Sequence, residues 1–233
     1  MLIASFDIGE KNFAYCIADY SANDAADTTD TSQLSILKIA HDNVILKKTQ
    51  TVIESCIRVS ALMSEDDQLM ACDRFVIEQQ MRCNTRAQRL AQHVWSTLYA
   101  RFPDRVIKFV PSHMKTQHFI GKNQLKDKER KTWSVVKVTQ EGVMGDSERH
   151  KEIIEEIEGM KKKDDICDTI LQAIAYVERE VRQSDARGGR GVRKTGHEQD
   201  ESVQHTKGES RGRGLQRGID IVKRNGRGRS IRE

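Results

Sequence analysis

Long hydrophobic runs are absent from this 233-residue chain. No segment approaches the roughly 18 consecutive apolar residues of a membrane-spanning helix, so no membrane span is expected. No basic segment precedes the short apolar start of the chain, and no secretory signal is therefore expected. No internal repeat with a period of roughly 20–50 residues is apparent. The length suits one domain with additional segments.

Cysteine is present, but not in any regular framework. The five cysteines include no Cys-x-x-Cys pair, and no histidine lies at zinc-finger spacing from them. An odd number without regular spacing indicates reduced thiols in an intracellular protein, most of them small core residues. The sequence therefore offers no sign of a disulfide scaffold or a zinc finger. The cysteines are Cys16, Cys56, Cys72, Cys83 and Cys167.

Charge and glycine are unevenly distributed. Residues 182–233 hold 14 Lys+Arg and 7 Asp+Glu, a net charge of +7, and residues 183–233 hold 10 of the 15 glycines. Because the whole chain has a net charge of +4, residues 1–181 are mildly acidic at −3. An Arg/Gly-rich segment cannot bury enough apolar surface to offset the cost of ordering, so residues 182–233 are expected to form a disordered tail. Such a tail could bind single strands or RNA without sequence preference, or it could serve only in localisation.

The apolar pattern predicts an α/β domain over residues 1–181. A short glycine-containing link at residues 7–12 favours a hairpin, and strands then alternate with helices, which indicates a mixed five-stranded sheet flanked by helices. Residues 112–163 are rich in lysine and poor in long apolar runs, and they are interpreted as a basic, partly mobile insertion. The expected strands are 2–6, 13–19, 34–40, 74–77 and 106–110, and the expected helices are 51–63, 85–100, 151–160 and 165–181.

Four carboxylates stand where apolar strands end or where a helix begins: Asp7, Glu78, Asp165 and Asp168. Burying an isolated carboxylate costs several kcal/mol, and neighbouring acids repel one another. A divalent cation removes both costs, and Mg²⁺ prefers such hard oxygen ligands. Two Mg²⁺ ions held by these acids can activate water, stabilise the phosphorane and stabilise the leaving oxygen in phosphodiester hydrolysis.

Each acid also has an ordinary structural explanation. Asp7 could begin a turn, Glu78 could be a solvated strand end, and Asp165 could stabilise a helix N-terminus. Asp164 shares a face with Asp168 at i,i+4 spacing, but it fits better as the N-cap of the last helix, so Asp165 is preferred as the ligand. Thr85 is similarly expected to cap the helix over residues 85–100.

Three segments carry a resemblance to a known family. Asp7-Ile8-Gly9-Glu10-Lys11-Asn12, Val76-Ile77-Glu78-Gln79-Gln80 and Lys162-Lys163-Asp164-Asp165-Ile166-Cys167-Asp168-Thr169 resemble, in this order, the acidic motifs of poxvirus-type Holliday junction resolvases. These enzymes form part of the RuvC-like branch of the RNase H superfamily, with relatives in large DNA viruses and fungal mitochondria. The similarity spans residues 1–181.

The resemblance implies an RNase H-like fold, a homodimer, two Mg²⁺ ions per site with Mn²⁺ as a substitute, and paired nicks across a four-way DNA junction. Carried over, the metal ligands are Asp7, Glu78, Asp165 and Asp168. The viral members also use a lysine upstream of the last helix, which suggests Lys131 as the catalytic cation that neutralises the scissile phosphate. A shifted alignment would give that role to Lys128 or Arg130 instead.

A four-way junction presents dense phosphate charge, so affinity should depend on basic residues near the acids. The helix face containing Arg82, Arg86 and Arg89 is a candidate for this role, although a solvated helix face explains the same spacing. Lys115, Lys122 and Lys161 to Lys163 add positive charge. The candidate DNA-binding residues are Lys11, Asn12, Gln79, Arg82, Arg86, Arg89, Lys128 and Arg130.

The leading hypothesis is a Mg²⁺-dependent endonuclease that resolves four-way junctions in recombination, repair or viral genome processing. A second hypothesis is an RNase H-like nuclease that acts on flaps, forks or RNA–DNA hybrids. The third is a non-catalytic nucleic-acid-binding protein dominated by its Arg/Gly tail. The resemblance places the protein in the virus-infected host cell, in the cytoplasm or the nucleus.

Overall fold

The computed structural model describes residues 1–9, 11–20, 34–121, 125–144 and 147–181. Five strands form one sheet in the order β3-β2-β1-β4-β5. The first three pair antiparallel as a meander, whereas β4 pairs parallel with both β1 and β5. The predicted mixed five-stranded sheet is therefore confirmed. The strands are β1 (Leu2–Ile8), β2 (Phe13–Tyr20), β3 (Leu34–Asp42), β4 (Arg74–Gln79) and β5 (Val106–Pro111). The tail expected at residues 182–233 lies outside the described residues.

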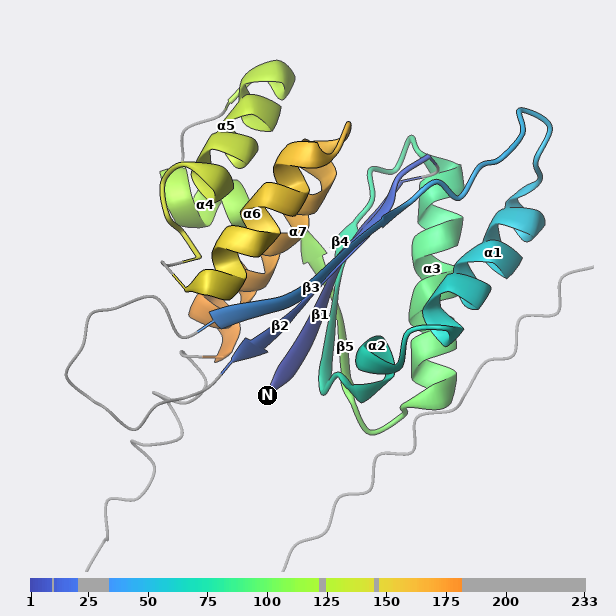
Figure 1. Ribbon diagram of the computed structural model, residues 1–233. Helices are drawn as coiled ribbons and strands as arrows, with labels where there is room; N and C mark the ends of the chain where they lie inside the picture. Colours follow the sequence, from blue (N-terminus) through green and yellow to red (C-terminus); the bar gives the residue numbers. More distant parts are fainter. Residues whose placement is uncertain (10, 21–33, 122–124, 145–146, 182–233) are drawn as a thin grey trace, which may run out of the picture. The chain divides into compact units, whose positions relative to one another are not determined.

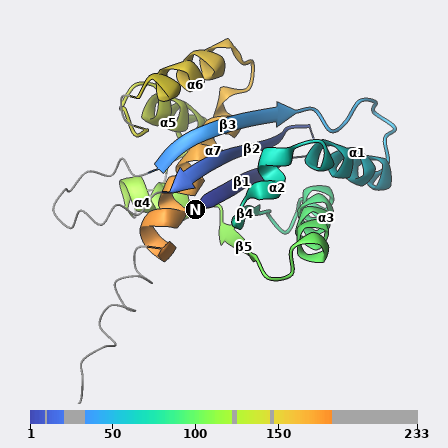
Figure 2. The same cartoon turned by 60° about the horizontal axis from the view of Figure 1, so that its bottom comes forward.

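Helices cover both faces of the sheet (Figure 1). One face carries α1 (Val52–Ser64), α2 (Asp67–Ala71) and α3 (Thr85–Arg101). The opposite face carries the helices of the later part of the described chain, as the turned view also shows (Figure 2). They are α4 (Met114–Ile120), α5 (Asp127–Thr139), α6 (Glu148–Gly159) and α7 (Lys163–Tyr176), which continues as a π-helix, Val177–Val181. Within the described part of the chain, no helix is both long enough and apolar enough to cross a membrane.

The central strand β1 is buried on both faces, because it lies between β2 and β4 and has helices above and below. Its residues Ile3 to Phe6 are all 0% exposed. Successive side chains of a strand point to opposite faces. Phe6 and Ile77 pack in the core under α1 and α3, whereas Val76 packs in the core under α7. The same alternation directs the residues that follow Phe6 and Ile77 toward α7.

The structure corrects the interpretation of residues 112–163 as an insertion. The described part of this stretch forms α4, α5 and α6, which pack on the same sheet face as α7. Val138, Met144, Ile153 and Ile157 belong to the hydrophobic core. These residues are separated by polar side chains and contribute at helical spacing, so the absence of long apolar runs did not reveal their burial.

Two predicted helix caps are wrong, by one residue at α3 and by two residues at α7. Asn84, not Thr85, caps α3, because its Oδ1 accepts a hydrogen bond from the Ala87 backbone N–H at 3.2 Å. Helix α7 begins at Lys163, so Asp164 lies in its first turn instead of at the N-cap. Both acids Asp164 and Asp165 therefore stand beside free backbone N–H groups, where negative charge is favourable.

A buried polar network joins the meander to α2. Asp66 is 5% exposed, caps α2 through the Leu69 backbone N–H, and accepts hydrogen bonds from the Tyr15 hydroxyl and from Lys38 Nζ at 2.8 Å. Burial alone would raise the pKa of the Asp66 carboxyl, but the hydrogen bonds from Lys38, Tyr15 and Leu69 outweigh it and lower the pKa. Ionised Asp66 therefore stabilises the fold.

We expect Asp66→Asn to lower the free energy of unfolding by about 1–3 kcal/mol at pH 7, because charge-assisted hydrogen bonds become neutral ones. The wild-type advantage is complete above the pKa of aspartate in the unfolded chain, about 3.9. It is lost as the pH falls through the lower pKa of the folded state. Urea unfolding at several pH values measures this, with the exposed neighbour Asp67→Asn as the control. An Asp66→Asn deficit that persists unchanged at pH 2 would contradict the assignment.

Candidate active site

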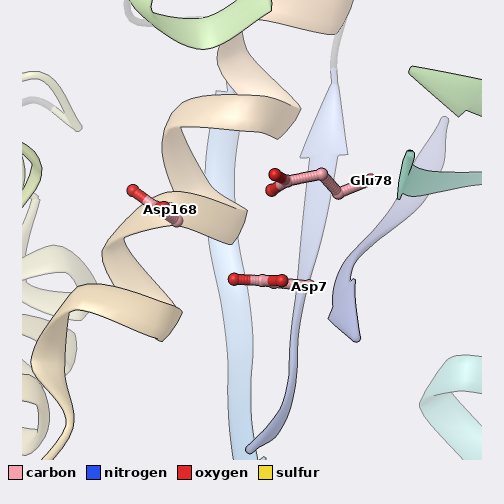
Figure 3. A group of neighbouring side chains, drawn as sticks. All are labelled: Asp7, Glu78 and Asp168. Carbon is pink, nitrogen blue, oxygen red and sulfur yellow. The ribbon is translucent and has the colours of Figure 1, made fainter. Parts of the chain in front are cut away.

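Strand register brings the first two acids together. Phe6 of β1 is the parallel partner of Ile77 of β4, so Asp7 and Glu78 follow at the same level, where the two strands end. By the alternation described above, both side chains lie on the face covered by α7. Figure 3 shows Asp7 and Glu78 extending from their strands toward that helix.

Helix α7 supplies the third acid, Asp168, and is fixed to the sheet one turn later. The buried Gln172 donates from Nε2 to Ser5 Oγ at 3.0 Å and to the Phe6 carbonyl at 3.2 Å. Residues at i and i+4 share one helix face, so anchoring Gln172 to the backbone beside Asp7 directs Asp168 to the same place. Gln172 is thus a positioning residue for the acids.

Carboxylate oxygens of Asp7, Glu78 and Asp168 all lie within 4.8 Å of one another. We call these three residues the acid cluster. The Oδ1 atom of Asp168 is buried and accepts no hydrogen bond from the described residues. A buried polar atom without a partner is uncommon in a native fold. Three convergent hard oxygen ligands, one of them unsatisfied, fit a divalent cation such as Mg²⁺.

Burial and the neighbouring acids raise the pKa of Asp7. Burial of the carboxyl is the largest cause, and repulsion from Glu78 and Asp168 adds to it, against a smaller opposing effect of Lys115. Without a cation, ionised Asp7 is therefore held in an unfavourable environment. Strongly shifted pKa values of this kind are typical of functional sites.

A lysine that the sequence analysis placed only among general DNA contacts lies at the centre of the acid cluster. Lys115 of α4 is 2% exposed, and its Nζ is 2.7 Å from Asp168 Oδ2 and 3.0 Å from Glu78 Oε2. Burial by itself lowers the pKa of this ammonium, but attraction to Glu78, Asp168 and Asp7 outweighs burial and raises the pKa above its usual value. Lys115 is therefore charged and partly neutralises the acids.

The predicted lysine, Lys131 of α5, lies elsewhere. Its Nζ is 2.6 Å from Asp164 Oδ2, and this hydrogen bond raises the pKa of Lys131. Burial would raise the pKa of Asp164, but Lys131 outweighs it and lowers that pKa. The structure thus places Lys131 beside the start of α7 and Lys115 within the acid cluster.

The fourth predicted acid, Asp165, is next to the acid cluster but not within it. Its Oδ2 is 3.5 Å from His41 Nε2 of β3, and it is buried without a hydrogen-bond partner among the described residues. Burial and then repulsion from Asp164 raise the pKa of Asp165, against a smaller effect of His41. Sequence reasoning missed His41, since its closeness to α7 depends on the position of β3 in the sheet.

The predicted DNA-binding residues lie in three places. Gln79, Arg82 and Arg89 line a groove of about 580 Å³ beside the end of β4. Lys11 and Asn12 line a second groove with His41. Arg86 instead donates to the Gln50 carbonyl at 3.0 Å and ties α3 to the segment before α1. The other two, Lys128 and Arg130, are on α5, with Lys128 exposed and Arg130 half-buried.

Curated relatives come from two viruses. Uncharacterized protein 170L of invertebrate iridescent virus 6 is 27% identical over 217 residues, which cover 75% of this chain and 87% of the relative. Uncharacterized protein 97L of invertebrate iridescent virus 3 is 24% identical over 210 residues, which cover 75% and 98%. The chain matches no protein-family model.

Solved structures show the same architecture. The yeast mitochondrial Holliday junction resolvase has a TM-score of 0.56 at 17% identity, covering 80% of this chain and 83% of its own. Fowlpox virus resolvase, solved with substrate Holliday junction DNA, has a TM-score of 0.50 at 17% identity, covering 76% and 97%. Thermus thermophilus RuvC has a TM-score of 0.50 at 11% identity, covering 76% and 96%. The chain therefore has the fold of the RuvC-like Holliday junction resolvases, as its three acidic motifs predicted.

Proposed function

We propose that this protein is a metal-dependent endonuclease that resolves four-way DNA junctions by paired, symmetric nicks. The observation that supports it most is the acid cluster with its buried lysine, located where β1 and β4 end in a RuvC-like fold. A binding protein without catalysis would gain nothing from three clustered, mutually repelling carboxylates. The nuclease hypothesis therefore explains a feature that the binding hypothesis leaves unexplained.

In this proposal Asp7, Glu78 and Asp168 hold the metal, with Asp165 completing the ligand set for a second ion. Mg²⁺, with Mn²⁺ as a substitute, would activate the attacking water and stabilise the charge on the scissile phosphate. Lys115 forms ion pairs with both Glu78 and Asp168, so among the described residues it is a cation that would lie beside the reacting phosphate. Lys131 remains a proposed phosphate contact at the edge of the site.

Paired nicks require two active sites, so the proposal includes a homodimer. The relatives in two iridescent viruses support a viral protein that acts on DNA in infected cells, in genome processing, recombination or repair. Four-way junctions arise where duplexes exchange strands, and an enzyme of this type would convert them into linear duplexes.

The test is a substrate panel with the purified full-length protein in Mg²⁺. A labelled four-way junction, a flap, a fork and an RNA–DNA hybrid are incubated in parallel, and nicks are mapped on each strand. We expect symmetric nicks in opposite strands of the junction only, and none with Asp7→Asn. Preferential cutting of the flap or the hybrid would instead identify a different RNase H-like nuclease. Intact substrates throughout would leave only the binding hypothesis.

A further inference from the structure

Two grooves flank a pair of adjacent lysines just before α7. Lys161 and Lys162, which we call the lysine ridge, line both of them. The first groove, of about 450 Å³, also contains Lys11, Asn12, His41, Asn43 and Met160. The second, of about 470 Å³, also contains Lys131, Thr132, Val135, Val136, Lys163 and Asp164.

The lysine ridge forms no ion pair with a carboxylate of the described residues, although the nearby Asp164 is attracted to Lys162. Both side chains are exposed, and neither has a carboxylate within ion-pair distance among the residues that the structure describes. Two other exposed lysines, in contrast, are paired: Lys47 with Glu54 at 3.0 Å and Lys151 with Glu148 at 3.3 Å. In a domain that is acidic overall, two adjacent exposed lysines without an ion pair among the described residues create a local positive field that attracts anions.

The ridge is also close to the acids. His41 lines the first groove and lies 3.5 Å from Asp165, and Asp164 lines the second groove. An extended anion that follows the ridge therefore passes beside the start of α7, which carries Asp168 one turn further on. Few anions other than a nucleic-acid backbone are long enough to occupy both grooves and reach the acid cluster.

The lining of the grooves decides which nucleic acid fits. Neither groove contains Phe, Tyr or Trp. Single strands are held mainly by stacking of bases on aromatic rings, in addition to phosphate contacts. Lysine, asparagine and threonine side chains instead bind phosphate and sugar oxygens and position a duplex without reading its sequence.

We propose that the lysine ridge and its two grooves bind the phosphodiester backbone of a double-stranded DNA arm next to the acid cluster. Lys161 and Lys162 contact phosphates, and Lys11 and Lys131 extend the contact on either side. The proposal that this duplex is an arm of a four-way junction rests on the proposed function. Binding of duplex DNA by the lysine ridge does not depend on cleavage.

The test compares Lys161→Ala/Lys162→Ala with wild type in binding to a labelled linear duplex, a four-way junction and a single strand, without divalent cations and at several salt concentrations. Each phosphate contact contributes about 0.9 to the slope of log affinity against log salt. We expect the slope to fall by about 1.8 and affinity at about 0.1 M salt to fall roughly 10- to 100-fold on both DNAs. Lys47→Ala/Lys151→Ala, which removes the same charge from ion-paired lysines, should leave the slope nearly unchanged.

Three results would overturn the proposal: an unchanged slope, an equal loss in the control variant, or a loss confined to single-stranded DNA. Circular dichroism of each variant checks the fold, and single Lys161→Gln and Lys162→Gln variants replace the double variant if it unfolds. If the junction-resolving function is wrong, wild type cleaves no junction, but the Lys161→Ala/Lys162→Ala variant still binds the duplex more weakly than wild type. The two outcomes are therefore distinguishable.

Discussion

The Asp7→Asn variant should melt at a higher temperature than wild type in EDTA, and it should lose DNA cleavage in Mg²⁺. Burial of the Asp7 carboxylate, together with repulsion from Glu78 and Asp168, raises its pKa. The folded state thus binds a proton that the unfolded state releases, so wild-type stability declines as the pH rises from the unfolded-state pKa of aspartate through the raised pKa of Asp7. Asparagine removes this repulsion and leaves the ion pairs of Lys115 in place.

We expect a gain of about 0.5–2 kcal/mol, typical of replacing a strained functional residue. Loss of a metal ligand worth several kcal/mol of transition-state stabilisation corresponds to at least about a 10³-fold decrease in cleavage rate. Thermal melts in EDTA and Mg²⁺, together with gel-based cleavage assays, measure both effects. The exposed Asp104→Asn is the matched control. A lower melting temperature in EDTA, or retained cleavage, would show that Asp7 is not a metal ligand of the acid cluster.

The second large effect is expected on replacing Lys115, because its positive charge reduces the repulsion among Asp7, Glu78 and Asp168 when no metal is bound. Lys115→Met keeps the length of the side chain but removes its charge, and it leaves the acid cluster unneutralised. Removing one partner of a buried ion pair costs about 3–5 kcal/mol. We therefore expect the melting temperature in EDTA to fall by about 6–20 °C, since each kcal/mol shifts a domain of this size by about 2–4 °C.

Divalent cations should restore much of that loss, because they supply the charge that the variant lacks. Mg²⁺ should therefore stabilise Lys115→Met more than it stabilises wild type, while cleavage stays impaired. The control is Lys108→Met, which removes an exposed ion pair with Glu180 that contributes about 0–1 kcal/mol. If Lys115→Met were as stable as wild type in EDTA, the lysine would not be a counterion of the acids.

The sheet was predictable because its signals are local. A buried run followed by a polar turn marks each strand, as at Leu2–Ile8 and Arg74–Gln79, and a four-residue link, residues 9–12, favours the pairing of β1 with β2. Errors occurred where several residues compete for one role. Asn84 and Thr85 can each cap α3, and only the backbone angles at the helix start select Asn84.

The helices within residues 112–163 and their burial were harder to predict from the sequence. Their apolar residues are dispersed among charged ones, and each of α4, α5 and α6 contributes only a few core side chains. Burial of such helices depends on a partner surface, here the sheet and α7, and this surface exists only after the chain has folded. Lys115 could not be singled out for the same reason. In the sequence it is one of many lysines, and its burial depends on how α4 packs in the folded chain.

The α/β sheet and the positions of Asp7, Glu78 and Asp168 near element ends follow from the sequence alone, because strand and helix periods are properties of short segments. Which charged groups meet depends instead on the packing of the folded chain. It joined Lys115 to Glu78 and Asp168, Lys131 to Asp164, and His41 to Asp165. Each of these pairs connects residues more than 30 positions apart, and their approach depends on how α4, α5, α7 and β3 pack, which no local pattern specifies.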